Sequence, residues 1–572
     1  MNGSARPDQP SIDSGADVVM EPPPHVPRPC AVRGHGSRRV QSTRFPFRSF
    51  RQTVSVAAML LGSGLLAQAA AAETLADAIS AAYDRNPVLV EQRYLQKARD
   101  ENYVQARSEY GPTLSVQSNG GYSSRRALGR TVNGNSGEVE ATISQPIYTA
   151  GRLRGAVESA RAGVLGGQQQ VRQVEQQTIQ NVVQVYAAVL RDEARLQVGL
   201  EALDVLRGQL EQNSKRQEKG DVTLTDVAQS RSRVESAEQQ VDVLDANMAT
   251  SRSQYLQVVG HNPGTLEPLP QLPTLPSTID QAFAKADEAS PQILIARFTE
   301  QSSSANAASV RGERGPTVSL TGQGIYSNRL FQFDGRSGSK EVFGGFTLSQ
   351  PLLTGGAIQS RIRQADARNL ADQAGVDAAR RGALQDVAQA WNDMAAARGA
   401  IAAGQRQVEA AQQAFAGMSC EELNGLRTTI ETLNAQRELQ GAQETLLQYR
   451  YQYYVSHAAL LAAMGVLSAQ DIVTNIAVYD PEANFRRVRN RGLMPLDYLG
   501  MALDRIGSAS PRRPLSGDLT GINVPASNAT AAMPDQPSDA MLHDKLTSRG
   551  DRTLRLPNGA VARCPLGTLR AR

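Results

Sequence analysis

The sequence SQPIYTAGR at residues 144–152 returns as SQPLLTGGA at residues 349–357, and the two strings begin 205 positions apart. Other strings recur at nearly the same separation. YGPTLSV, which starts at Tyr110, is matched by RGPTVSL, which starts at Arg314. A constant offset of this size indicates one duplication of a long unit and not a solenoid of short repeats.

The duplication divides the chain into five parts. We expect a first repeat at 73–277 and a second repeat at 278–475, each with helices, two strands, a long helix and a return helix. An N-terminal extension with a signal peptide, 1–72, precedes them. A C-terminal extension, 476–507, follows. The last part, 508–572, is expected to be disordered because it is poor in large apolar residues and rich in Pro, Ser and Asp.

The segment before the first repeat has the parts of a secretory signal. Arginines precede an apolar run at 54–67, and Ala70 and Ala72 form a small-residue cleavage site. The run is shorter than the roughly 20 residues that a membrane-spanning helix needs. We therefore expect a secreted chain whose mature form begins near Glu73.

The composition gives no indication of catalytic or nucleic-acid chemistry. The formal charge of +4 is small for 572 residues, so a nucleic-acid partner is not indicated. The five His and three Cys residues are scattered, without metal-ligand spacing, and there is no nucleophile elbow or phosphate loop. We expect no catalytic residues, no metal site and no cofactor.

Each repeat contains one very long helix. Residues 151–220 contain no Pro, and apolar residues there recur in steps of three and four, which is coiled-coil spacing. The stripe comprises Val182, Val185, Val189, Leu196, Leu203, Leu206 and Leu210, and in the second repeat Leu384, Val387, Trp391, Met394, Ile401, Val408 and Phe415. A helix of about 65 to 70 residues is roughly 100 Å long. Two shorter helical segments, about 75–109 and 222–259, would match it when stacked end to end.

Two segments in each repeat alternate with the period of a strand. They are PTLSVQSNGGY and EVEATISQPIY in the first repeat, and PTVSLTGQGIY and EVFGGFTLSQPLL in the second. A length of about 10 to 12 residues suits a tilted strand that crosses a bilayer. We expect Ile143 and Leu348 on the lipid face, and Thr142 and Thr347 on the other. Hairpins on a soluble domain remain the alternative, although they would leave exposed edges.

The recurring strings themselves are expected to join strand to helix. Pro146 cannot donate a hydrogen bond to a strand ladder, so the strand is expected to end there. Gly151 permits the sharp change of direction into the long helix. Pro351 and Gly355 are the corresponding residues of the second joint.

These features together resemble the TolC family of outer-membrane efflux and secretion ducts. The resemblance covers about 74–475 and includes the duplication, both joints and the segment GLRTTIETLNAQRELQGAQETLLQYRYQYYVSHAALLAAMG. The string YDPEANFRRVRNRG after the second repeat is similar to the family's C-terminal extension, which lies in the equatorial region.

The number of strands argues independently for an oligomer. Four strands per chain cannot close a barrel, because about eight are needed. The resemblance implies a homotrimer that is mainly α with a small transmembrane β part. Three chains with four strands each would form a shared 12-stranded β-barrel in outer-membrane lipid, and their coiled-coil helices would form a periplasmic α-barrel. It also implies docking, through a periplasmic adaptor, onto an inner-membrane ABC or proton-driven transporter, and passive export without a chemical step from a Gram-negative cell.

The turns RQEKGDVTLTD and SCEELNGLRTTIE lie farthest from the strands and are expected to form a periplasmic tip. The resemblance implies a gate of polar links there, with Asp226 and Arg427 at the matching positions. A family tyrosine is replaced by Glu422, so that Arg427 has a second candidate partner. Glu431 and Asn434 match a lumen ring that selects cations. Without the resemblance, these charges would be ordinary solvated groups at helix ends.

Two other classes of protein stay open from the residues alone. A periplasmic adaptor would also contain coiled-coil hairpins, but strand pairs of membrane length would be unexpected in it. A structural coiled-coil protein of the envelope would lack the strands altogether.

Overall fold

The computed structural model describes residues 72–506, apart from 128, 329–337, 474–475, 493 and 496. The predicted signal peptide and the predicted disordered tail therefore lie outside the described residues, apart from Ala72.

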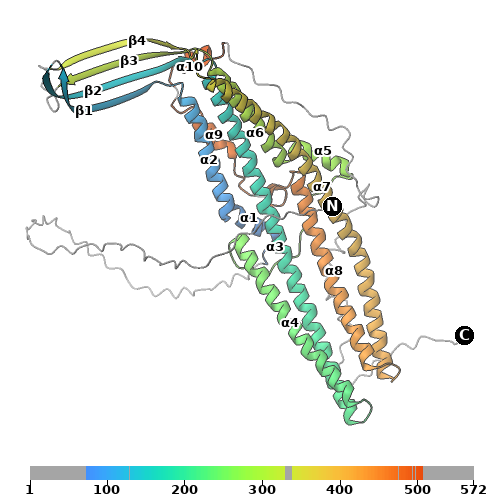
Figure 1. The fold of residues 1–572 in the computed structure, drawn as a ribbon. Helices are drawn as coiled ribbons and strands as arrows, with labels where there is room; N and C mark the ends of the chain where they lie inside the picture. The colour runs from blue at the N-terminus through green and yellow to red at the C-terminus, as the bar shows by residue number, and fades with distance from the viewer. Residues whose placement is uncertain are drawn as a thin grey trace, which may run out of the picture. The chain divides into compact units, whose positions relative to one another are not determined.

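The two halves of the described chain are built from the same succession of elements (Figure 1). The first half contains α1 (Leu75–Arg85), α2 (Pro87–Ser108), β1 (Thr113–Ala127), β2 (Arg130–Tyr148), α3 (Arg152–Glu218) and α4 (Leu224–Val259). The second half contains α5 (Ile279–Ala289), α6 (Pro291–Gly312), β3 (Thr317–Asn328), β4 (Ser339–Ser349), α7 (Ala357–Leu423) and α8 (Thr429–Ala463). Three short elements follow, η1 (Ala469–Asp471), α9 (Pro481–Val488) and α10 (Asp497–Leu503).

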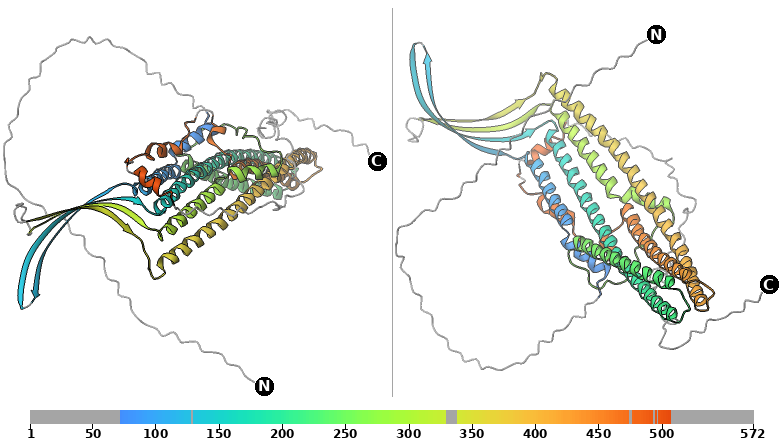
Figure 2. Two further views of the ribbon diagram at one scale, coloured as in Figure 1. Left: turned by 90° about the horizontal axis from the view of Figure 1, so that it is seen from above. Right: turned by 60° about the horizontal axis from the view of Figure 1, so that its bottom comes forward.

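The predicted long helices are confirmed, since α3 and α7 each have 67 residues. Both begin after a glycine in the left-handed conformation, Gly151 with φ 81° and Gly356 with φ 82°. The apolar stripe is buried along its middle, at Val182 and Val189 in α3 and at Trp391 in α7. The return helices α4 and α8 run back beside α3 and α7 as two hairpins (Figure 2).

The segment expected as one helix at 75–109 is two helices, α1 and α2. Asn86 has extended backbone between them, because Pro87 disfavours the helical conformation in the residue before it. The Asn86 side chain caps α2 and also donates from Nδ2 to the Val258 carbonyl at 3.0 Å. This hydrogen bond ties the start of α2 to the end of α4, so the two shorter helices meet end to end, as expected.

The four strands form one antiparallel sheet in the order β1-β2-β3-β4. The predicted alternation of faces is confirmed, although β1 and β2, with 15 and 19 residues, are longer than expected. The register sets apolar residues of all four strands on one face, including Leu114, Val116, Ile143, Val318, Leu320, Phe346 and Leu348. The opposite face is mostly polar, although Ile325 and Phe343 also lie on it. There the Glu140 carboxylate accepts from Gln323 Nε2 at 2.5 Å and from the Thr142 hydroxyl at 2.8 Å.

The main core lies where the middle of the long helices meets α1, α5 and the connector between the repeats. Trp391, Tyr186 and Tyr255 are among the largest fully buried side chains. The Tyr186 hydroxyl shares its one hydrogen between the carbonyl oxygens of Glu73 and Glu267, which lie 2.9 and 2.8 Å away, and so fixes the start of the first repeat to the connector. Among the described helices, none is both long enough and apolar enough to span a membrane.

Candidate functional site

The turn of the first hairpin is built around a capping box. Gly220, with φ 84°, follows the end of α3, and Thr223 is the N-cap of α4. Asp226 donates from its backbone N–H to the Thr223 hydroxyl oxygen at 3.2 Å. Its carboxylate in turn accepts from the Thr223 backbone N–H at 3.0 Å and from the hydroxyl at 2.7 Å. The predicted gate residue Asp226 therefore stabilises the first turn of its own helix.

The turn of the second hairpin repeats this arrangement with an added arginine. Glu431 closes a capping box on Thr428, accepting from its backbone N–H at 2.9 Å and from its hydroxyl at 2.8 Å. Arg427 donates to Glu431 Oε1 at 3.0 Å and to Glu421 Oε2 at 2.8 Å. These bonds from Thr428, with the Arg427 guanidinium, hold the pKa of the Glu431 carboxyl below its usual value.

The expected partners at the tip do not meet within one chain. Among the described residues no hydrogen bond or ion pair joins Asp226 to Arg427, since each bonds within its own hairpin. Arg427 also does not pair with Glu422, whose carboxylate accepts from the Thr429 hydroxyl at 2.9 Å. The pairing of Glu421 with Arg427 was not predicted from the sequence. The four-residue spacing of Arg427 and Glu431 on a helix start could have indicated their pair.

Asn434, expected in a lumen ring, contacts the other hairpin of the same chain. Its Oδ1 accepts from Arg233 Nη2 of α4 at 3.2 Å. Beside it, Leu433 of α8 is buried in a small cluster with Leu203, Leu206 and Val234 of the first hairpin. The two hairpins of one chain are thus held together close to the tip.

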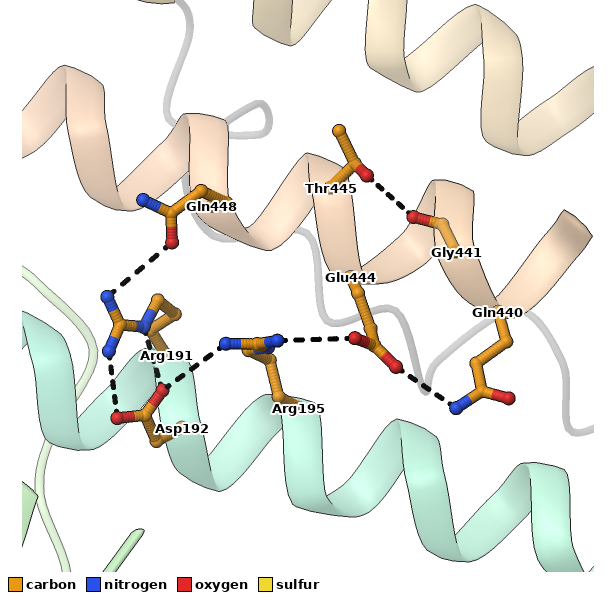
Figure 3. Close-up of polar contacts among 8 residues, drawn as sticks. All are labelled: Arg191, Asp192, Arg195, Gln440, Gly441, Glu444, Thr445 and Gln448. Carbon is orange, nitrogen blue, oxygen red and sulfur yellow. Dashed lines mark hydrogen bonds and ion pairs between the residues drawn. The ribbon is translucent and has the colours of Figure 1, made fainter. Parts of the chain in front are cut away.

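A polar network joins the hairpins farther from the tip, between α3 and α8 (Figure 3). Arg191 donates to both carboxylate oxygens of Asp192 at 2.8 Å, and these bonds raise the pKa of the Arg191 guanidinium. Asp192 is only 3% exposed and also accepts from the Ser251 hydroxyl of α4. Arg195 reaches Glu444 of α8 at 3.3 Å.

Arg191 continues this network to the aromatic face of α8. Its guanidinium carbon lies 4.4 Å from the ring centroid of Tyr451, and its Nη1 is 3.5 Å from Gln448 Oε1. The sequence did not predict this network, because the helix prediction rested on the apolar stripe and not on the charged residues between its members.

The first strand–helix joint is held by a residue from the C-terminal extension. The Asp504 carboxylate, fully buried, accepts from the backbone N–H groups of Thr149 and Gly151, at 2.7 and 3.1 Å. It also accepts from the Tyr110 hydroxyl at 3.0 Å. Between these donors Ala150 has a φ of 54°, and among the described non-glycine residues only this one has a positive φ.

The joints differ in detail from the expectation. β2 runs past Pro146 to Tyr148, with a bulge between them, because a proline that lacks a donor can occupy an irregular position in a ladder. β4 does end before Pro351. Gly355 has a φ of 60° and corresponds to Ala150, while the residue that corresponds to Gly151 and precedes the long helix is Gly356.

The described residues contain no group of three or more His, Cys, Asp or Glu side chains placed to hold a metal ion.

Comparison with known proteins gives one consistent assignment. The family model described as outer membrane efflux protein matches residues 78–261 and 283–466, one match in each half. The outer membrane efflux protein BepC of Brucella suis biovar 1 (strain 1330) is 30% identical over 448 residues, which are 78% of this chain and 97% of BepC. The outer membrane protein TolC of Escherichia coli (strain K12) is 24% identical and covers 72% of this chain and 89% of its own.

Solved structures agree at the level of the fold. A crystal structure of CusC, described in terms of folding and transmembrane channel formation, superposes with a TM-score of 0.62 at 21% identity. The match covers 68% of this chain and 92% of CusC.

Proposed function

The chain belongs to the outer membrane efflux protein family, and on this premise we propose that three copies of it form one passive duct from the periplasm through the outer membrane. The family places the protein in the outer membrane of a Gram-negative bacterium as an export channel. Membership of this family decides against the two alternatives that the residues alone left open, a periplasmic adaptor and a structural coiled-coil protein.

The observation that carries the proposed assembly is the four-stranded sheet with two open edges. Its strands are long enough to cross a bilayer, and it has one apolar and one mostly polar face. Four strands cannot close on themselves, so strands of other copies must complete the barrel. Three copies would give 12 strands, with the polar face toward a water-filled lumen and the apolar face toward lipid.

The helices supply the periplasmic part of the proposed duct. At about 1.5 Å per residue, α3 and α7 are each roughly 100 Å long. We propose that they and the stacked shorter helices form the wall of a tunnel. Transport along such a tunnel needs no chemical step, so we do not expect enzymatic activity.

The tip is proposed as the closed end of the tunnel. Arg427 is exposed and Asp226 is half-buried, and both are already oriented by the hydrogen bonds of their own turns. In the proposed trimer, the Arg427 guanidinium of one copy pairs with the Asp226 carboxylate of another. A guanidinium and a carboxylate can form two parallel hydrogen bonds, and a docking partner could break this pair. Glu431 and Asn434 are proposed to line the lumen there. Because Asn434 is neutral and Glu431 is partly neutralised by Arg427, their selection for cations is expected to be weak.

The proposed partners follow from this arrangement. A periplasmic adaptor would engage the outer surface of the hairpins and connect them to an inner-membrane transporter, driven by ATP or by protons. The surface that the adaptor would meet is the exposed side of the two hairpins near the tip.

The proposal is tested with the purified protein in mild detergent and in planar bilayers. We expect light scattering to give the mass of three copies, and we expect the same sample to form ion-conducting channels. A stable monomer without conductance would contradict the proposal.

A further inference from the structure

The short helix α10 exposes apolar side chains and buries acidic ones. Tyr498 and Leu499 of the helix, and Ile506 just beyond its end, are 61%, 57% and 68% exposed. Asp497, its first residue, is only 2% exposed, and Asp504, which follows its last residue, is fully buried. A helix that faces water has the opposite arrangement, with charged residues outward and apolar residues inward. The exposed side of α10 is therefore suited to an apolar environment.

The rotation of α10 is fixed by the hydrogen bonds of its two aspartates. The Asp497 carboxylate accepts from the Met494 backbone N–H at 2.8 Å. The Asp504 carboxylate accepts from the backbone N–H groups of Thr149 and Gly151 at the first joint. A rotation that buried the apolar side would break these bonds, so the apolar side stays exposed.

The helix lies at the base of the sheet, where the strands meet the long helices (Figure 1). Tyr148, the last residue of β2, donates from its hydroxyl to the Ile506 carbonyl at 3.3 Å. A Cβ added to Gly500 of α10 would lie 3.3 Å from the Pro146 carbonyl oxygen. These contacts place α10 against the end of β2.

The helix also lies on the apolar side of the sheet. Gln145 of β2 pairs with Leu320 and so shares the apolar face with it, but it is buried. Its Nε2 donates to the Tyr110 carbonyl at 2.6 Å, and the Tyr110 hydroxyl donates to Asp504 at 3.0 Å. Tyr110 thus connects this face to the end of α10, which lies at the foot of the apolar face.

The apolar face begins at the level of α10. Leu348 is adjacent to the last residue of β4, and Leu114 is adjacent to the first residue of β1. The residues of β1 on this face remain uncharged from Leu114 to Tyr122, and Arg126 lies farther out. This stretch of about nine residues has the length of a tilted transmembrane strand. The periplasmic boundary of the lipid is therefore expected beside α10.

The exposed charges around α10 are positive. Between residues 489 and 506 the only acidic residues are Asp497 and Asp504, which are both buried, whereas Arg489, Arg491 and Arg505 are exposed. Apolar side chains flanked by exposed arginines are typical of helices that lie on a phospholipid surface. This charge favours lipid phosphates over a second copy of the chain as the partner of this surface.

We propose that α10 lies on the periplasmic surface of the outer membrane, with Tyr498, Leu499 and Ile506 inserted between the phospholipids of the inner leaflet. The inference rests on the proposed barrel, because the apolar face of the sheet sets the level of the lipid. The amphipathic ring of Tyr498 suits the boundary between lipid and water. The C-terminal extension then provides a membrane contact of its own, in addition to the strands.

Tryptophan fluorescence in brominated lipid tests this contact, because bromine quenches a tryptophan only when the two are close together. The full-length protein is reconstituted in vesicles of phosphatidylglycerol mixed with brominated or unbrominated phosphatidylcholine. The probes are Tyr498→Trp and Ile506→Trp, measured separately. The native Trp391 is buried in α7, roughly 50 Å from the joint at about 1.5 Å per residue, so the unsubstituted protein gives the background.

Two further variants supply the controls. Phe346→Trp places a probe on the apolar face of the sheet, where the proposed barrel requires lipid. Leu426→Trp places an equally exposed probe at the tip, beyond the far end of α7. Light scattering checks that each variant has the mass of the unsubstituted protein.

We expect bromine to quench Tyr498→Trp, Ile506→Trp and Phe346→Trp several-fold more strongly than Leu426→Trp. If Phe346→Trp is quenched and both α10 probes are not, the helix does not contact lipid, and the proposed barrel stands. A blue-shifted emission without quenching would then assign the apolar side of α10 to a contact with another copy. Quenching of Leu426→Trp equal to that of the α10 probes would show non-specific contact with the vesicles and also overturn the inference. If Phe346→Trp is not quenched either, the lipid face of the sheet is wrong and the proposed function fails with the inference.

Discussion

The Asp504 carboxylate accepts two hydrogen bonds from Thr149, one from the backbone N–H and one from the hydroxyl, both at 2.7 Å. The two residues are 355 positions apart in the chain. Asp504, which belongs to the C-terminal extension, therefore caps the turn that contains Ala150. Ala150 has a left-handed backbone conformation there. In the second joint Gly355 occupies the position that corresponds to Ala150, and a glycine adopts a left-handed conformation without backbone strain.

We predict that Asp504→Ala weakens the trimer. The substitution leaves the Thr149 and Gly151 backbone N–H groups buried without an acceptor, which costs about 1–3 kcal/mol for each. The expected result is a lower midpoint of thermal dissociation in detergent. Asp504→Asn is the matched control, since it keeps one carbonyl acceptor and should lose less stability. A thermal midpoint equal to that of the unsubstituted protein in Asp504→Ala would show that the joint does not depend on this carboxylate.

The pair of Arg195 and Glu444 is predicted to couple the two hairpins. Both side chains are partly buried, so their coupling free energy should lie toward the upper end of about 0.2–1 kcal/mol. The measurement is a double-mutant cycle of Arg195→Ala and Glu444→Ala on the free energy of unfolding. Lys215 and Glu211, an exposed pair within α3, supply the control cycle, which should give a smaller coupling. Equal couplings in the two cycles would contradict the role given to the network in Figure 3.

Stability is predicted to fall below about pH 6.5 because of His457. The ring is buried, and this burial lowers its pKa, although its Nε2 lies 3.0 Å from the Pro273 carbonyl. The unfolded chain therefore takes up a proton near pH 6.5 while the folded chain remains neutral, so folding weakens as the pH falls from there toward the lowered pKa. The slope for one group is at most about 1.4 kcal/mol per pH unit.

Urea unfolding at pH 7.5 and at pH 5.5 checks this prediction in the unsubstituted protein and in His457→Gln. The loss of unfolding free energy between the two pH values should be smaller in the variant, which has no group to protonate there. The same loss in both proteins would assign the pH dependence to other groups.

Features that repeat with a short period along the chain could be predicted from the sequence, whereas contacts between distant segments could not. The long helices were predictable because residues 151–220 contain no Pro and repeat apolar residues in a helical period. The strand faces were predictable because their period is two residues. The Asp504–Thr149 contact has no such periodic signature, since it depends on how the C-terminal extension folds back.

The candidate site was less predictable than the fold for a related reason. Which carboxylate Arg427 selects depends on the rotation of the last turn of α7, where Glu421 and Glu422 are neighbours in sequence but bond to different residues. Asp226 and, as a second candidate, Glu422 were predicted from the sequence as partners of Arg427, whereas in the structure Arg427 donates to Glu421 and Glu431. Likewise, a left-handed residue was expected to be glycine, and Ala150 departs from that rule because Asp504 holds its neighbours.

Charged substitutions on the two faces of the sheet should have opposite outcomes. Leu348 lies on the apolar face, and Arg at this position should impair assembly by about 2–4 kcal/mol if it lies near the bilayer midplane. Thr347, the adjacent residue, lies on the polar face and supplies the matched control, because Arg there would face the lumen. The measurement is the yield of trimer in the outer-membrane fraction. A normal yield of Leu348→Arg would reverse the assignment of the lipid face.

The tip is predicted to limit conductance through its charged residues. Arg427→Ser removes the guanidinium that we propose to link neighbouring copies, and Asp226→Asn removes the opposite charge while keeping an acceptor for the Thr223 cap. Both variants should therefore raise the single-channel conductance of the trimer without unfolding the hairpins. Lys215→Ala, which removes an exposed ion pair from α3, is the control and should leave the conductance unchanged. If both tip variants conduct like the unsubstituted trimer, Asp226 and Arg427 are only local caps of their own helices, and the constriction of the duct lies elsewhere along its length.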